Sequence, residues 1–177
     1  ETIYIKKDMP LNRRMLRRDI LRINNIYHDK GYSQAKVYKT TTPKKSNDPL
    51  IFHISEGEIS EIIITGNTRT KEYVILREMT TKPGMAWQDD RIKEDLRRVF
   101  NLNFFQDIQP EILPSEKKNA KILRLNIAER PTNATFTFGG GYSPTMGFSI
   151  FSDLFWDNLL GTAQVIMLKG QFGRANT

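Results

Sequence analysis

Arginines at helical spacing are the residues of this sequence whose type and position most clearly suggest binding chemistry. Arg14, Arg18 and Arg22 recur every four residues, which places them on one face of a helix, and guanidinium groups bind carboxylates and phosphates. Residues 1–57 carry 12 Lys and Arg against 6 Asp and Glu, whereas residues 58–177 are almost balanced. The net charge of +7 therefore lies mainly in the first part. It fits an acidic partner, lipid headgroups or nucleic acid, or simply a solvated helix face.

Catalytic and metal-binding arrangements are not expected in this sequence. The acids between positions 89 and 95 could form an acid–base or metal cluster, but acids are favoured in the first turn of any helix. His28 and His53 lie in separate predicted elements, and the chain has no cysteine, so no zinc site is expected. There is no phosphate loop and no nucleophile elbow. We therefore expect neither an enzyme nor a cofactor.

Nucleic-acid binding is a more distant alternative for the basic first part. A small α/β module with a basic helix resembles several RNA-binding folds in outline, but a KH-type domain needs Gly-x-x-Gly between two helices. The only such motif, Gly170-Gln171-Phe172-Gly173, falls in a strand-like run. We therefore expect no nucleic-acid partner.

Residues 58–131 have the pattern of one α+β module in the order β-α-α-β-β. A β-branched run at 59–64 ends at a Gly-Asn turn and predicts a strand. Thr70 is expected to be the N-cap of a helix that reaches about Met79. Strands at 106–113 and 123–127 form a predicted hairpin. Between them a second helix begins at Asp89, with a buried face formed by Ile92, Leu96, Val99 and Phe100.

Residues 1–57 repeat the later part of this pattern at an offset of about seventy residues, which indicates tandem modules. A helix is predicted from Leu11 to Lys30, followed by strands at 36–41 and 50–55. The first strand and helix of this copy are expected to be lost by truncation. The helix face predicted to point inward consists of Leu11, Met15, Ile20, Ile23 and Tyr27.

From Thr135 the composition changes, because charge nearly vanishes and aromatic residues alternate with small or polar ones. Three runs, 135–143, 148–156 and 162–172, have the length of transmembrane barrel strands, with turns at 144–147 and 157–161. In the second run Phe148, Ile150, Leu154 and Trp156 should face one side, opposite Ser149 and Asp153. An ordinary soluble hairpin sheet is the alternative. The expected divisions are therefore 1–57, 58–131 and 132–177.

Several short motifs, in a fixed order, resemble the BamA family of outer-membrane proteins. They include Gly66-Asn67-Thr68, Arg77-Glu78-Met79, Asn103-Phe104-Phe105 and Glu129-Arg130-Pro131, followed by 136–142 and by Asp157-Asn158-Leu159-Leu160-Gly161-Thr162. The likeness is nearly continuous from 59 to 170 and resembles the last POTRA module running into the first barrel strands. The family has tryptophan where this sequence has Leu160. The fold class implied is α+β, with tandem βααββ POTRA modules, the first truncated, followed by antiparallel strands of an incomplete barrel.

The resemblance also implies a function. In such proteins the POTRA modules lie in the periplasm and hold lipoproteins and unfolded outer-membrane proteins, while the barrel contacts outer-membrane lipid. Barrel strand one pairs with an incoming client strand, and its residues here are Thr135, Phe136, Thr137, Phe138, Gly139, Gly140, Gly141 and Tyr142. The three glycines would loosen that strand, or would only relieve crowding in a curved wall. Relatives that secrete polypeptide through their own pore, and organellar relatives, remain alternatives.

Pro110 gives an expectation about partner binding by the modules. Because proline lacks an N–H, the strand at 106–113 should lie at the edge of its sheet and should be partly blocked for backbone pairing. We expect partners to use the corresponding strand of the first module more, at Lys36, Val37, Tyr38 and Lys39. The arginine face could contact an acidic partner or lipid headgroups.

Overall fold

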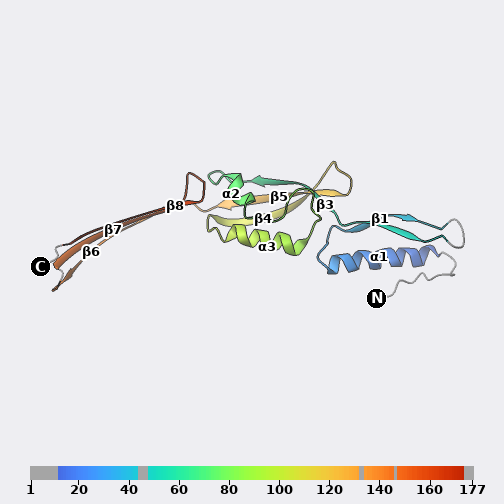
Figure 1. Ribbon diagram of the computed structural model, residues 1–177, viewed down its shortest axis with the longest axis horizontal. Helices are drawn as coiled ribbons and strands as arrows, with labels where there is room; N and C mark the ends of the chain where they lie inside the picture. Colours follow the sequence, from blue (N-terminus) through green and yellow to red (C-terminus); the bar gives the residue numbers. More distant parts are fainter. Residues whose placement is uncertain (1–11, 44–47, 132–133, 146, 174–177) are drawn as a thin grey trace. The chain divides into compact units, whose positions relative to one another are not determined.

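The computed structural model describes residues 12–43, 48–131, 134–145 and 147–173. The elements follow in the order α1 (Arg13–Asp29), β1 (Lys36–Thr41), β2 (Ile51–Ser55), β3 (Glu58–Thr65), α2 (Glu72–Leu76), α3 (Asp89–Phe100), β4 (Phe105–Pro114), β5 (Ala120–Glu129), β6 (Ala134–Ser143), β7 (Gly147–Leu159) and β8 (Gln164–Gly173) (Figure 1). The predicted α+β class is confirmed. Among the described residues, no helix has the length and hydropathy required to cross a membrane.

The α1 helix carries the arginines of the first part. Its N-cap is Asn12, whose side chain accepts a hydrogen bond from the Arg14 N–H at 2.8 Å, and Gly31, with φ +82°, follows its last turn. The strongly buried residue of this helix is Asp19, which the sequence pattern did not identify. Leu11, the first residue predicted to point inward, lies outside the described residues. Strands β1 and β2 pair antiparallel, with a bulge between Val37 and Lys39.

The prediction of a Thr70 N-cap was wrong. The short α2 helix begins one residue later than expected, with Lys71 as N-cap and without a capping side chain, and it ends at Leu76 rather than near Met79. The side chain of Thr70 has other partners, described below. Helix α3 has the predicted start, with Asp89 and Asp90 in its first turn, but Phe100 is 44% exposed and does not belong to the buried face.

Strands β3, β5 and β4 form one sheet in that order, so β4 lies at an edge as Pro110 predicted. Contacts divide the chain into two compact units, residues 1–63, 80–95 and 110–125 in the first and residues 64–79, 96–109 and 126–177 in the second. The buried apolar side chains of the first unit include Ile59, Trp87, Ile92, Leu123 and Leu125. Those of the second include Val74, Ile75, Val99, Phe105 and Ile127.

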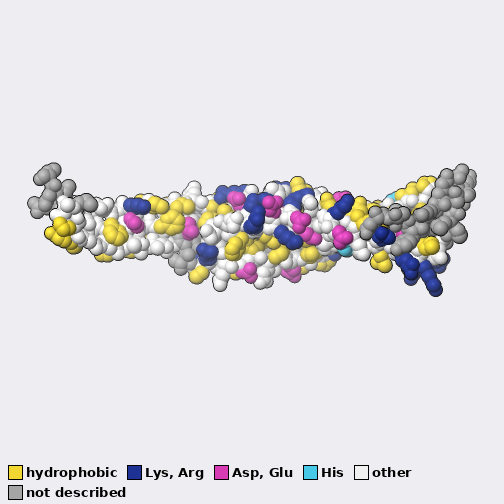
Figure 2. All heavy atoms as spheres, turned by 90° about the horizontal axis from the view of Figure 1, so that it is seen from below, with side chains coloured by type: hydrophobic (Ala, Val, Ile, Leu, Met, Phe, Trp, Pro, Cys, Tyr) yellow, Lys and Arg dark blue, Asp and Glu magenta, His cyan; other side chains and the backbone are white. Residues whose placement is uncertain are grey.

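Strands β6, β7 and β8 form a separate antiparallel sheet in sequence order. The register joins Phe136 to Leu154 and Leu154 to Leu168, and successive rows on this face are also largely apolar. Strand β7 continues to Leu159, two residues beyond the predicted turn start, and the chain turns at 160–163 before β8. Figure 2 shows few charged side chains along these strands.

The opposite face of this sheet is mixed. Thr137, Asp153 and Lys169 share one row, which places opposite charges on neighbouring strands. Phe151 and Phe155 also lie on this face, at positions that alternate with the predicted polar residues Ser149 and Asp153. The predicted alternation therefore holds for the apolar face, whereas the other face is less polar than expected.

Candidate functional site

The outer edge of β6 is the first candidate site. In the described part of the chain β6 pairs only with β7, through ten register positions from Ala134 to Ser143. The aromatic side chains of β6 are largely exposed to solvent, with exposed fractions of 68% for Phe136, 69% for Phe138 and 76% for Tyr142. All of the residues predicted for strand pairing, 135–142, thus lie on one edge strand. An unpaired edge of this kind can accept another strand through its backbone.

The three glycines of β6 differ in their surroundings. A Cβ atom on Gly139 would lie 2.4 Å from Cζ of Phe151, its cross-strand partner, so this position has room only for glycine while the Phe151 ring stays in place. A Cβ on Gly141 would meet nothing within 4 Å. Relief of crowding therefore accounts for Gly139, while Gly141 is free of any such steric requirement.

Glu129, at the end of β5, is a buried hub just before β6. Its side chain is 5% exposed and accepts hydrogen bonds from the Thr70 N–H at 2.7 Å, the Thr68 hydroxyl at 2.8 Å and the Arg69 N–H at 2.9 Å. The Arg69 Nε atom lies 3.4 Å from the same carboxylate. The Arg69 guanidinium also donates to the backbone carbonyls of Arg130 and Pro131. One carboxylate and one guanidinium thus fix the loop before α2 against the chain that leads into β6.

The protonation of Glu129 reflects this environment. Burial is the largest single influence and raises the pKa, but the hydrogen bonds from Thr70, Thr68 and Arg69 together outweigh it and lower the pKa of Glu129 to about 2. Glu129 is therefore a carboxylate at every physiological pH.

The turn between β7 and β8 is held by the same loop. The buried Asn158 donates from Nδ2 to the Thr70 hydroxyl at 2.8 Å, and its Oδ1 accepts from the Ala163 N–H at 2.9 Å. The Gly161 carbonyl accepts from the Lys71 N–H at 2.9 Å. A Cβ on Gly161, which has φ +75°, would lie 1.9 Å from the Arg69 carbonyl oxygen, so only glycine permits this approach.

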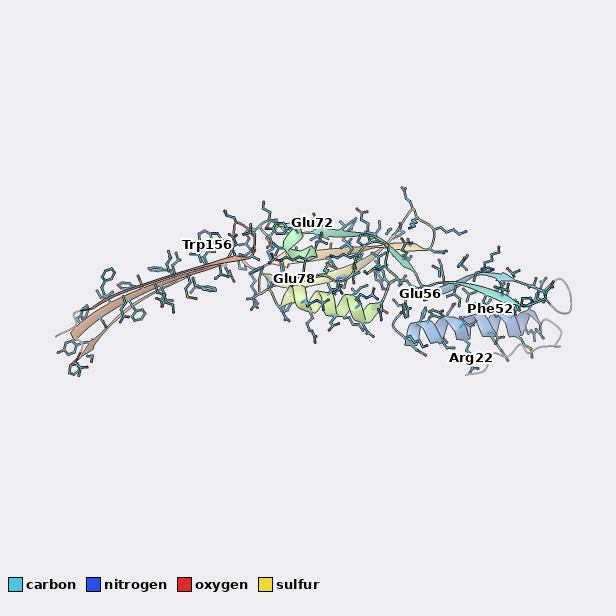
Figure 3. The ribbon with its side chains drawn as sticks, viewed as in Figure 1. Arg22, Phe52, Glu56, Glu72, Glu78 and Trp156 are labelled. Carbon is cyan, nitrogen blue, oxygen red and sulfur yellow. The ribbon has the colours of Figure 1, made fainter. Side chains whose placement is uncertain are left out.

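Three non-glycine residues at the end of β7 and in this turn adopt positive φ: Asn158 at 50°, Leu160 at 52° and Ala163 at 61°. Such conformations are unfavourable by about 1 kcal/mol or more for residues with a Cβ, and they persist where surrounding contacts fix them. The turn presents Leu160 to solvent with 78% exposure. Beside it lies a pocket of about 490 Å³, lined in part by Arg69, Leu160 and Trp156, the last labelled on β7 in Figure 3.

A second buried carboxylate, Asp95 of α3, has a similar role in the other unit. It accepts hydrogen bonds from the Thr80 N–H, the Thr80 hydroxyl and the Thr81 N–H, each at 2.9 Å. Burial raises the pKa of Asp95, but the hydrogen bonds from Thr81 and Thr80 lower it overall. Asp95 therefore anchors the segment before α3.

The edge strands of the two modules differ in their available donors. On β4, the Ile108 N–H is donated to the side chain of Asp107 at 2.8 Å, and Pro110 has no N–H. On β1, the Val37 N–H is donated to Asn24 Oδ1 at 2.9 Å. The β4 edge therefore lacks two donors at alternate positions, and the β1 edge lacks the donor of Val37.

The structure also shows how exposed the arginines of the predicted face are and which groups lie beside the two histidines. Arg14 and Arg18 are exposed on α1, whereas Arg22, labelled in Figure 3, is half-buried. His28 lies 3.2 Å from the Ala35 carbonyl, and His53 lies 3.0 Å from the Thr41 hydroxyl. Within the described ranges no group of three or more metal-ligating side chains occurs.

Sequence reasoning missed the roles of Glu129, Asn158, Asp95 and the Thr70 side chain. Glu129 lies within the Glu-Arg-Pro motif, but the residues around that motif do not indicate its hydrogen-bond donors, which lie about sixty residues earlier in the chain. Asn158 and Thr70 are 88 residues apart. The only local signal for their importance is that Glu129 and Asn158 fall within two of the motifs that resemble the BamA family, at 129–131 and 157–162.

Comparison with known proteins places these features in a family. The POTRA family model, described as surface antigen variable number repeat, matches residues 1–57 and 58–130. The chain is 29% identical over 175 residues to outer membrane protein assembly factor BamA of Neorickettsia risticii, covering 97% of this chain and 23% of that protein. The chain spans less than a quarter of the length of the curated relatives it matches.

Solved structures agree. The N-terminal domain of Omp85 from Thermosynechococcus elongatus is 32% identical, with a TM-score of 0.55, over 69% of this chain and 55% of that one. BamA from Haemophilus ducreyi lacking POTRA domains 1–3 shares the fold, with a TM-score of 0.59 at 23% identity, over 96% of this chain and 33% of that one. The family match to both predicted modules, with these relatives, shows that the chain belongs to the POTRA family and is a BamA-like protein.

Proposed function

We propose that this chain is the membrane-proximal part of an outer-membrane protein assembly factor. Its modules would lie in the periplasm and hold lipoprotein partners and unfolded clients, and β6 to β8 would begin a barrel in contact with outer-membrane lipid. The observation that carries the proposal is the β6–β8 sheet, which combines a largely apolar face with an edge strand that has no second partner in the described residues. In lipid, the backbone groups of such an edge require a partner strand.

The proposed activity is strand templating, without covalent chemistry. A client strand would pair with β6 through backbone hydrogen bonds, while its alternate side chains would extend the apolar face formed by Phe136 and its row partners. Glycines at 139–141 weaken β6 and would allow its pairing to be exchanged. The Glu129 hub would hold the start of β6 in place during this exchange.

Site-specific photocrosslinking in the native protein tests this proposal. A photoreactive residue at Gly140 on β6 should capture an unfolded barrel protein, whereas one at Ser152 in the centre of β7 should not, because β7 is paired on both sides. A secretion pore would instead place its passenger along the mixed face. Crosslinks centred on Thr137 and Asp153, with none at Gly140, would therefore favour that alternative.

We further propose that the β1 edge of the first module binds extended partner segments in preference to the β4 edge. The two missing donors on β4, at Ile108 and Pro110, support this. Crosslinkers at Lys36 to Lys39 should capture partner peptides more often than crosslinkers at 106–113. The reverse distribution would contradict the proposal.

A further inference from the structure

A basic pocket lies where the first POTRA module meets the second, within the first compact unit. Its volume is about 200 Å³. Two segments contribute most of its lining. The first lies just before and at the start of β1 and supplies Gln34 and Lys36. The second runs through the β4–β5 turn into β5 and supplies Lys117, Lys118, Asn119 and Lys121. We propose that this pocket binds a phosphate monoester group that bridges the two modules.

The charges around the pocket are unbalanced. Lys117 is paired with Glu58, with 2.5 Å between Nζ and Oε1. Among the described residues no carboxylate lies within ion-pair distance of Lys36, Lys118 or Lys121. The acids adjacent in sequence, Glu116 and the Glu56 labelled in Figure 3, are exposed and do not line the pocket. Three lysine residues without a paired carboxylate therefore line one concavity, and the repulsion between their like charges favours a bound anion.

The size of the pocket selects a compact anion. Liquid water occupies about 30 Å³ per molecule, so the pocket has the volume of about six or seven waters. That accommodates one phosphate group with a small part of its carrier. A phosphate monoester carries nearly two negative charges near pH 7 and has three acceptor oxygens, which suits a small pocket lined by several lysines. An acidic peptide spreads its charges along an extended chain and suits a concave pocket less well.

The module boundary beside the pocket is held together independently of any ligand, and Gly57, which lines the pocket, belongs to it. The Gly57 carbonyl accepts from the Trp87 N–H at 2.6 Å, and the Gly31 carbonyl accepts from the Asp89 N–H at 2.8 Å. Asp89 Oδ1 also accepts from the Ser33 hydroxyl at 2.7 Å. Because the module boundary is already formed, a phosphate would bind to a built site and would slow local opening of that boundary.

Hydrogen exchange in the native protein tests the proposal. Inorganic phosphate should slow exchange of the amides at 114–121 and around Lys36, beyond the effect of sodium chloride at equal ionic strength. The double variant Lys118→Glu and Lys121→Glu should weaken this protection at least tenfold in phosphate concentration. Lys93→Glu, an exposed lysine on α3 already paired with Asp90, is the matched control and should leave the protection unchanged.

The remaining arms identify the source of the phosphate. Protection by phosphatidic acid vesicles at a phosphate concentration at least tenfold below that required of inorganic phosphate, with none by phosphatidylcholine vesicles, would assign a lipid headgroup. Protection by inorganic phosphate without this advantage of the vesicles would assign a soluble phosphate compound. No protection by either probe would overturn the proposal. Equal protection by a poly-glutamate peptide of matched charge, or by sodium chloride, would overturn it as well.

Discussion

The substitution Glu129→Gln tests whether this carboxylate anchors the start of β6. The glutamine side chain would keep one acceptor oxygen but would turn an NH₂ group toward N–H and O–H donors, leaving the buried Thr70 N–H or the Arg69 N–H without a partner. The pKa of Glu129 falls from 4.5 to about 2 on folding, and its side chain is 5% exposed. At about 1.36 kcal/mol per pKa unit, the carboxylate stabilises its surroundings by about 3 kcal/mol at pH 7.

The assay is hydrogen exchange of the Arg69 and Thr70 amides in the native protein. The variant should lower the free energy of local opening by about 2 to 3 kcal/mol, and exchange should be about 30- to 150-fold faster. Glu111→Gln is the matched control, because Glu111 is exposed on β4 and pairs with Arg124 at the surface. It should change opening by less than about 0.5 kcal/mol.

The pH dependence of the difference in opening free energy between the wild type and Glu129→Gln supplies a second test, and its direction can be predicted. Because the pKa of Glu129 is depressed in the folded protein, its contribution is complete above about pH 4.5 and is lost as the pH falls through about 2. The difference between wild type and variant should therefore shrink between these values. A difference below about 0.5 kcal/mol at pH 7, or one that stays constant down to about pH 2.5, would refute the reasoning.

Three further predictions concern single positions. Asp95→Asn should lower the free energy of unfolding in urea by about 2 to 4 kcal/mol, because the amide keeps one acceptor oxygen and turns its NH₂ group toward the N–H of either Thr80 or Thr81; a loss below about 1 kcal/mol would contradict its anchoring role. Gly139→Ala should destabilise the detergent-solubilised protein by about 1 kcal/mol in thermal unfolding, because the partly exposed ring of Phe151 must shift, and Phe151→Ala added to it should restore part of the loss, whereas Gly141→Ala should have little effect. Pro110→Val should restore one edge donor and strengthen binding of an extended peptide at β4 about fivefold, measured by titration, and unchanged affinity would show that the missing N–H is not what blocks this edge.

Local patterns were sufficient to predict most of the secondary structure and one feature of topology. The amphipathic α3 helix, the strand at 59–64 and the three strands after residue 132 follow from periodicity, which depends only on neighbouring residues. The edge position of β4 followed from the missing N–H of Pro110, which is a property of that residue alone. Composition likewise separated the β6–β8 segment, which has few charges, from the charged modules.

The interactions that fix the candidate site could not be predicted in this way. Thr70 has the residue type of an N-cap, yet its N–H is donated to Glu129, 59 residues later, and its hydroxyl accepts from Asn158, 88 residues later. Local sequence cannot choose between a cap and such distant partners, because the choice depends on which strands the fold brings beside the loop. The sequence by itself determined which segments become strands and helices. Only the tertiary structure decided that one buried glutamate joins the second module to the first strand of the apolar sheet.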